Sequence, residues 1–234
     1  MVGLSDSQVY ERALAYWPYK DSLRKVIDHI CVNAPIDRSL LDLMCGPGYL
    51  LGQVAARRKD LSLKGVDLDS MNIAHSKREY PGIDFEVGDV LLWKPDHLFD
   101  VVACTGALHH IQYGRQEEAI EGIASMVKPG GIVIISDSYI ADYSNETERK
   151  AAAAKLGQEY LGETIQNGAP EPVIEATMQI LWNDVLMKEF KTSMNRRLPI
   201  FKKIFSHVKT LKTWPEFESE YGDYISVCRK SHGA

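Results

Sequence analysis

The stretch Leu40-Leu41-Asp42-Leu43-Met44-Cys45-Gly46-Pro47-Gly48-Tyr49-Leu50 decides the fold of this chain. It predicts a buried strand that ends near an acidic residue, followed by a glycine-rich turn that opens a helix. Glycine has no side chain, so such a turn lets the backbone approach a bound nucleotide-like ligand closely. The identity of that ligand is the question that the rest of the sequence must answer.

Two ligands suit this turn. A dinucleotide is the first, because Gly46, Gly48 and Gly52 form a stretched version of the G-x-G-x-x-G pattern. S-adenosylmethionine is the second, because it also presents an adenosine ribose but carries a positive sulfonium and no phosphate. Asp42 favours the second ligand, since a carboxylate at this place attracts a cation and would face the pyrophosphate of a dinucleotide.

Residues 38–138 resemble the class I S-adenosylmethionine-dependent methyltransferases, with the motifs of that family in order. One departure is Met44, which stands where the family has its first motif glycine. The stretches that carry the resemblance are Asp42–Gly48, Leu63–Met71, Phe85–Val90, Phe99–Ile111 and Val127–Ile135, which are similar to the first motif and to the second, third, fourth and fifth strands with their loops.

The resemblance implies a doubly wound, seven-stranded, mostly parallel sheet with an antiparallel last strand, which is the Rossmann-like methyltransferase fold. It also implies that Asp67 accepts from both ribose hydroxyls, that Leu68 packs on the adenine, and that Asp89 accepts from the adenine amino group. S-adenosyl-L-methionine would be the cofactor and S-adenosyl-L-homocysteine its product. The expected cofactor-binding residues are Asp42, Met44, Cys45, Gly46, Gly48, Asp67, Leu68, Asp89, Val90 and Thr105.

The 234 residues fit a single domain. Strands alternate with helices expected at 49–58, 70–79 and 115–127, which indicates a parallel sheet with right-handed crossovers. We expect N-terminal helices within residues 1–35 and a helical insertion at about 140–195, followed by a helix near 199–208 and two short strands near 210–214 and 223–229. The insertion follows the fifth strand, at the sheet edge where ligands bind, so these helices would form a lid over the acceptor.

Within the insertion, a helix is expected to begin at Asn145 with Glu148 as its partner. The next helix carries Pro172 in its first turn. Its expected apolar stripe consists of Val173, Ile174, Met178, Leu181, Val185 and Leu186.

His109 and His110 follow the fourth strand, at the edge that faces the cofactor. In plant-type O-methyltransferases, a histidine at what resembles the His109 position is the general base, a role that suits a group titrating near neutral pH. The alternative is that these histidines bond to backbone or only shape the pocket. Both are therefore candidate catalytic residues.

Candidate acceptor-binding residues come from two places. Asp137 and Tyr139 are expected in the loop after the fifth strand, where they could orient the acceptor or simply lie in water. Tyr10, Trp17 and Tyr19 could close over the sulfonium, because an aromatic face favours a cation. Ordinary helix packing is the alternative for each of these aromatic residues.

Composition narrows the class of protein. The formal net charge of -5 argues against a general nucleic-acid binder, and 45% hydrophobic residues support a real core. No apolar run approaches the roughly 20 residues that span a bilayer, and residues 1–11 show no signal-peptide core. The four cysteines are far apart, so we expect no metal site and no disulfide framework, and a cytoplasmic protein.

The favoured function is an enzyme that methylates a small metabolite or natural product, because a lid excludes large substrates. An RNA or protein methyltransferase is an alternative, since residues 188–212 hold eight Lys or Arg and one acid. A non-catalytic cofactor binder and a nicotinamide dehydrogenase are further alternatives. The acceptor atom (oxygen, nitrogen, sulfur or carbon) and a homodimeric state stay open at this point.

Overall fold

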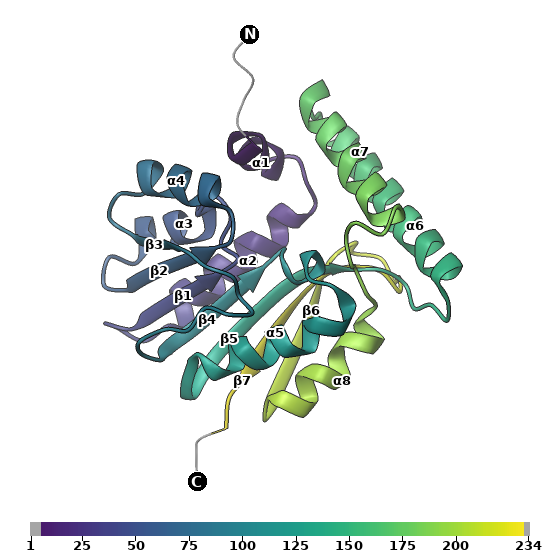
Figure 1. Ribbon diagram of the computed structural model, residues 1–234. Coiled ribbons are helices and arrows are strands. Elements are labelled where there is room, and N and C mark those ends of the chain that lie inside the picture. Colours follow the sequence, from purple (N-terminus) through teal and green to yellow (C-terminus); the bar gives the residue numbers. More distant parts are fainter. Residues whose placement is uncertain (1–5, 232–234) are drawn as a thin grey trace.

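A seven-stranded sheet organises the protein (Figure 1). The computed structural model describes residues 6–231, with side chains from residue 10, so the first five residues of the expected segment 1–35 lie outside the described residues. The strand order is β3-β2-β1-β4-β5-β7-β6, with β7 antiparallel to both neighbours and the other pairs parallel. The predicted fold class is confirmed. The strands are β1 (Ser39–Leu43), β2 (Ser62–Asp67), β3 (Asp84–Val87), β4 (Phe99–Thr105), β5 (Val127–Tyr139), β6 (His207–Trp214) and β7 (Gly222–Arg229).

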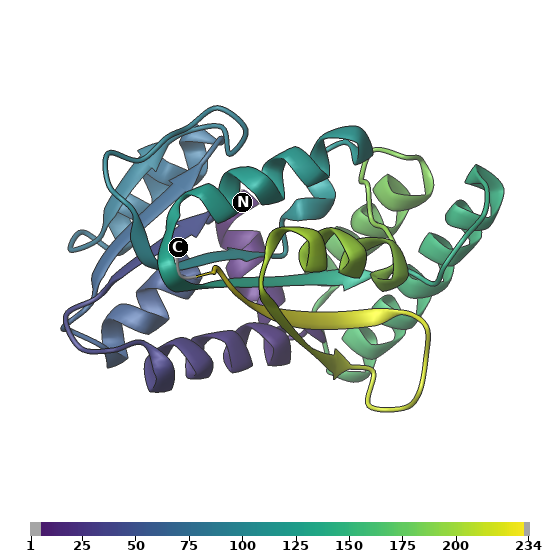
Figure 2. The same cartoon turned by 90° about the horizontal axis from the view of Figure 1, so that it is seen from below.

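Helices cover both faces of this sheet, and α2 and α5 lie on opposite sides of it in Figure 2. Leu40, Val101 and Ile134 point toward α2 (Tyr19–Asn33) and α3 (Tyr49–Arg57), in a core that also receives Ile73 of α4 (Ser70–Glu79). Their neighbours Leu41, Val102 and Val133 point toward α5 (Tyr113–Ser125) and α8 (Met194–Ile204). Successive strand residues alternate between faces, so continuous apolar runs are required where both faces are buried. None of the helices in the described part of the chain is long and apolar enough to cross a membrane.

Several element boundaries differ from the sequence prediction: α5, for example, ends at Ser125, and β6 begins at His207. The helix expected near 199–208 is α8, which begins at Met194 because the Ser193 side chain accepts from Arg196 N, and Pro199 lies inside it. Strand β5 runs on to Tyr139, because Ser138 pairs with Asp223 and Tyr139 with Gly222 of β7. The expectation that Asp137 and Tyr139 lie in a loop after the fifth strand is therefore wrong.

The insertion after β5 forms a helical hairpin of α6 (Glu146–Gln166) and α7 (Glu171–Val185), which projects beyond the sheet (Figure 1). Asn145 caps α6 by accepting from Glu148 N at 3.0 Å, as predicted. Helix α1 (Asp6–Leu14) contacts both α7 and α4. These contacts place α1 and the hairpin on the side of the sheet where β1, β4 and β5 end.

The predicted apolar stripe of α7 is wrong in part. Val173 is buried as expected, but Met178 and Leu186 are exposed. The buried face instead includes Thr177 and Asp184, which are polar. Polar side chains can occupy a buried helix face when they form hydrogen bonds: Thr177 bonds with Trp17, and one oxygen of Asp184 bonds with Lys191.

Gly222 offers a direct test of the strand pairing around β5. Its φ of 141° is rare for a residue with a side chain, and an added Cβ would lie 2.0 Å from the carbonyl oxygen of Trp214. We expect Gly222→Ala to lower the free energy of unfolding by about 3 kcal/mol, measured by urea denaturation. Gly114→Ala is the matched control, because its added Cβ meets nothing within 4 Å. It should be neutral or stabilise by up to about 1 kcal/mol, and equal losses in the two variants would contradict this account.

Candidate functional site

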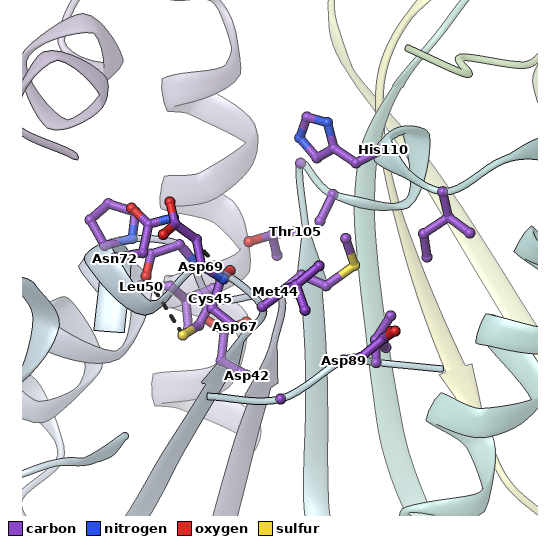
Figure 3. A pocket seen from close by; sticks show the side chains of 18 of the residues that line it. Asp42, Met44, Cys45, Leu50, Asp67, Asp69, Asn72, Asp89, Thr105 and His110 are labelled. Carbon is purple, nitrogen blue, oxygen red and sulfur yellow. Dashed lines mark hydrogen bonds between the residues drawn. The ribbon is translucent and has the colours of Figure 1, made fainter. Parts of the chain in front are cut away.

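The carboxyl ends of β1, β2, β3 and β4 open into a first cavity of about 720 Å³ (Figure 3). Asp42, Asp67 and Asp89 all line it, each at or just after the carboxyl end of a different strand. Figure 3 shows Asp42 and Asp67 on one side of the cavity and Asp89 on the other. The three carboxylates singled out in the sequence are therefore brought together.

The glycine turn depends on left-handed backbone at three positions. Gly46 has a φ of 53° and Gly48 a φ of 84°. A Cβ at Gly48 would lie 2.9 Å from the Phe85 ring, whereas one at Gly46 would meet nothing within 4 Å and would project where a ligand could approach. Met44 adopts a φ of 56° without being glycine, a conformation that costs about 1–2 kcal/mol. Its side chain lines the cavity and packs against the core that Leu41 and Val102 share.

Asp67 is held rigidly at the end of β2. One of its oxygens accepts from Gly46 N at 2.8 Å, and the other accepts from Asp69 N at 2.9 Å and Asn72 Nδ2 at 3.5 Å. A carboxylate offers about four lone-pair sites, so this arrangement leaves capacity for a ligand. Asp67 thus fixes the turn after β1 and can still accept from hydroxyl groups in the cavity.

Asp42 is 1% exposed, and its Oδ1 atom has no hydrogen-bond partner among the described residues. Burial raises the pKa of Asp42 well above its usual value, and the nearby Asp67 charge raises it further. A buried acid without a partner is costly unless a ligand compensates it. A positively charged group in the cavity would do so.

The remaining predicted cofactor residues line the first cavity, with the exception of Gly48. Asp89 lines the cavity and accepts from Leu91 N at 2.9 Å. Leu68 is 69% exposed and offers a bare apolar surface to a flat ring. The others that line the cavity are Cys45, Val90 and Thr105. Gly48 does not line it; it precedes the first turn of α3 and so shapes the turn from behind.

A second cavity of about 190 Å³ adjoins the first, and Tyr10, Gly106 and His110 line both. The α6–α7 hairpin closes one side of it with Leu156, Gly157 and Leu181. Trp17 and Tyr19 also line this second cavity, so Tyr10 alone of the three predicted aromatic residues reaches both spaces. Anything bound in the second cavity would meet a ligand of the first at this shared boundary.

His109 lines the second cavity from the 3-10 helix η1 (Leu108–His110). Its Nδ1 lies 2.6 Å from Asp137 Oδ1, and because a carboxylate only accepts, the imidazole donates here. Burial lowers the pKa of His109. Burial also acts to raise the pKa of Asp137, but His109, Lys191 and Arg197 hold it below its usual value. The pair therefore presents a neutral imidazole whose Nε2 is an acceptor.

His110 is more exposed, and its Nδ1 lies 2.7 Å from Glu189 Oε2. Burial acts to raise the pKa of Glu189, but the hydrogen bond with His110 and the charges of His110, His109 and Lys191 together outweigh it, and the pKa is lowered. His109, His110 and Glu189 each place one potential metal ligand within 4.8 Å of the others. The expectation of no metal site was based on cysteine spacing, which gives no information on this cluster.

Tyr139 lines neither cavity. It is 2% exposed, and its ring packs edge-on against Tyr224 of β7. Because β5 continues to this residue, its side chain belongs to the sheet and not to an acceptor loop. Asp137 also lies outside both linings and reaches the second cavity only through His109.

The eight cations of residues 188–212 do not form one exposed basic surface. Lys191 and Arg197 are buried. Arg196 pairs with Asp142, Lys203 pairs with Glu117, and Lys212 donates to the carbonyl of Phe217. Five of its eight cations are thus already engaged or buried, which weakens the case for a nucleic-acid surface.

Sequence reasoning missed the buried ion pair of the second cavity. Lys191 Nζ donates to Asp184 Oδ2 at 2.7 Å, and both residues line the cavity. Lys191 was counted only as one member of the basic segment. The signal that could have revealed the pair is Asp184, because this charged residue lies on the same buried face of α7 as Val173 and Thr177.

Known proteins resemble this chain in the region that carries Asp42, Asp67 and Asp89. Residues 40–131 match the methyltransferase domain family. Trans-aconitate 2-methyltransferase of Variovorax paradoxus is 25% identical over 123 residues, which cover 51% of this chain and 47% of that enzyme. The chain thus spans about half the length of this curated relative. Carboxy-S-adenosyl-L-methionine synthase of Campylobacter jejuni is 23% identical over 204 residues, which cover 86% of this chain and 83% of that protein.

A solved structure extends the likeness to the whole fold. The N-methyltransferase NodS of Bradyrhizobium japonicum, in complex with S-adenosyl-L-homocysteine, matches with a TM-score of 0.62. The match covers 95% of this chain and 96% of that one, at 13% identity. At this identity the likeness shows a shared fold.

Asp223 of β7 makes the stability of the protein depend on pH. It is fully buried, accepts from Ser138 Oγ at 2.5 Å, and burial raises its pKa to about 7. The folded state therefore holds a proton that the unfolded state has released, so stability is lost as pH rises toward 7. Relative to the wild type, Asp223→Asn should gain about 2 kcal/mol or more in free energy of unfolding between pH 5 and pH 8. Urea titrations at each pH measure this, and a difference that does not vary with pH would contradict it.

Proposed function

We propose that this chain, which carries a class I methyltransferase domain, binds S-adenosyl-L-methionine in the first cavity and methylates a small molecule in the second. The observation that carries the proposal is the convergence of Asp42, Asp67 and Asp89 on a cavity that opens at Tyr10, Gly106 and His110 into another. A methyl donor and its acceptor would meet at that boundary. The methyltransferase relatives support the same assignment.

Charge favours a sulfonium cofactor over a dinucleotide. Asp42 is buried and its Oδ1 has no partner, and Asp67 lies close enough to raise its pKa. The pyrophosphate of a dinucleotide would add negative charge beside these two acids, whereas a cationic ligand would stabilise their ionised forms. Asp67 would accept from the ribose hydroxyls, Leu68 would pack on the adenine, and Asp89 would accept from its amino group.

When bound, S-adenosyl-L-methionine would supply an electrophilic methyl group to the acceptor and leave as S-adenosyl-L-homocysteine. The protein's contribution is alignment of the two reactants, which can supply several kcal/mol of the barrier reduction. His109 Nε2 would take the proton that an acceptor hydroxyl loses, and Asp137 would stabilise the resulting imidazolium through Nδ1. Helix α1 and the α6–α7 hairpin would act as the lid that excludes water.

The acceptor would be a small molecule because its cavity is small and the α6–α7 hairpin closes one side of it. Its volume is about 190 Å³, which suits a compact metabolite and not a folded macromolecule. The separated cations of residues 188–212 give less support to an RNA or protein acceptor. Trans-aconitate, named for one relative, illustrates the size of acceptor that such a domain can take.

Cofactor binding can be measured without knowing the acceptor. By isothermal titration, S-adenosyl-L-homocysteine should bind the wild type, and Asp67→Asn should weaken binding about 10- to 100-fold through lost charge-assisted hydrogen bonds. Asp69→Asn is the matched control, because Asp69 lines the same cavity but caps α4, and asparagine caps helices equally well. If the same titration detected binding of NADH and no binding of S-adenosyl-L-homocysteine, the proposal would be contradicted.

Removal of the imidazole tests the proposed base. With an acceptor found by screening small molecules for S-adenosyl-L-homocysteine release, His109→Ala should lower kcat about 100-fold or more and leave cofactor affinity nearly intact. His97→Ala is the control, because that histidine lines neither cavity and contacts only Asp96 and the Phe99 ring among the contacts of its side chain described for residues 6–231. Unchanged turnover in His109→Ala would make His109 a wall of the cavity and would remove its catalytic role.

A further inference from the structure

Three aromatic side chains that line the second cavity, Trp17, Tyr19 and Tyr160, have their polar atoms engaged in hydrogen bonds. Trp17 Nε1 donates to Thr177 Oγ1 at 2.8 Å, and Tyr19 OH donates to the carbonyl of Ser136 at 3.2 Å. Tyr160 OH accepts from Tyr19 N at 3.0 Å. Since these polar atoms already have partners, the rings offer flat hydrocarbon faces and edges. A planar apolar body fits such walls.

The polar groups of the cavity gather where α7 ends. Asp184 and Lys191 form an ion pair of 2.7 Å with side chains only 3% and 6% exposed. Lys191 Nζ has three donors, and the described residues provide a partner for one of them. Asp184 Oδ1 is buried and has no hydrogen-bond partner among the described residues. The pair therefore has donors and an acceptor available beside an apolar space.

This pair is fixed next to the proposed base by backbone contacts. Arg149 donates to the carbonyls of Asp184 at 2.6 Å and Glu189 at 2.8 Å. Phe190 N donates to the carbonyl of His109 at 2.6 Å. The segment from α7 to Lys191 is thus joined directly to η1. The free groups of the ion pair and the imidazole of His109 share one cavity at fixed positions.

We propose that Asp184 and Lys191 determine acceptor specificity by binding a second hydroxyl group on a single-ring aromatic acceptor. This inference rests on the proposed function. The second hydroxyl would donate to Asp184 Oδ1 and accept from Lys191 Nζ, while the reacting hydroxyl lies at His109. The acceptor class is therefore a monocyclic phenol that carries another hydroxyl.

The size of the cavity agrees with one ring. A dry cavity of about 150 Å³ is known to hold benzene, and the second cavity measures about 190 Å³. The additional space leaves room for substituents on that ring. A site built to hydrogen-bond a hydroxyl rejects an analogue that lacks it, because buried polar groups are then left unpaired.

The test compares matched probes that differ only in the second group. Methyl transfer is measured with catechol, resorcinol and hydroquinone, and with 2-, 3- and 4-methylphenol, which replace one hydroxyl by a methyl of similar size. The wild type should prefer its best dihydroxybenzene over the corresponding methylphenol by at least about 10-fold in kcat/KM. Asp184→Asn and Lys191→Met should reduce this preference to below about 2-fold.

Two controls separate specificity from folding and from the proposed function. Glu175→Gln and Lys188→Met alter exposed charges nearby and should keep the wild-type preference. Titration with S-adenosyl-L-homocysteine gives the folded, binding-competent fraction of every variant, so rates are compared per competent site. A purely structural ion pair would lower the rates for both probes in equal proportion and leave their ratio unchanged.

Several outcomes would overturn the inference while the proposed function stands. These are equal rates for both probe types in the wild type, a preference that survives in both variants, and failure of every probe to react in protein that binds S-adenosyl-L-homocysteine. Loss of S-adenosyl-L-homocysteine binding by the wild type would instead overturn the proposed function, and with it the inference.

Discussion

The hydrogen bond from Gly46 N to Asp67 Oδ2, 2.8 Å long, is the interaction on which the site depends. It joins the turn after β1 to the end of β2, and the other oxygen of Asp67 holds the start of α4 through Asp69 N. The left-handed backbone at Gly46 and Gly48 allows that turn to fold back toward β2. The Asp67 carboxylate thus fixes the turn after β1 relative to the start of α4, and both line the first cavity. A ligand would therefore bind to a preorganised site.

A second connection joins the sheet to the inserted helices. The backbone bond between Phe190 and His109 and the two carbonyls held by Arg149 tie the segment after α7 to η1. Arg149 is almost fully buried, and such a charge is tolerated only with well-formed partners. The boundary between the two cavities is consequently made of residues that are far apart in sequence, and its geometry depends on the packing of α6 and α7.

Sequence reasoning recovered the sheet and the first cavity because both depend on local patterns. Apolar runs followed by an acid or by glycine mark each strand end, and parallel strands bring these ends to one edge. The second cavity could not be predicted in this way. Asp184, Lys191 and Glu189 reach it through long-range contacts, and the apolar stripe assigned to α7 placed Met178 and Leu186 inside, although both are exposed. Tyr139 was misplaced because pairing with β7 extends β5 beyond its apolar run.

A crystal structure of the protein with S-adenosyl-L-homocysteine would test the central claim most directly. The account predicts ribose hydroxyls on Asp67, the adenine between Leu68 and Asp89, and the sulfur at the boundary that Tyr10, Gly106 and His110 form with the second cavity. Ligand density elsewhere on the molecule, or a sulfur directed away from that boundary, would contradict it.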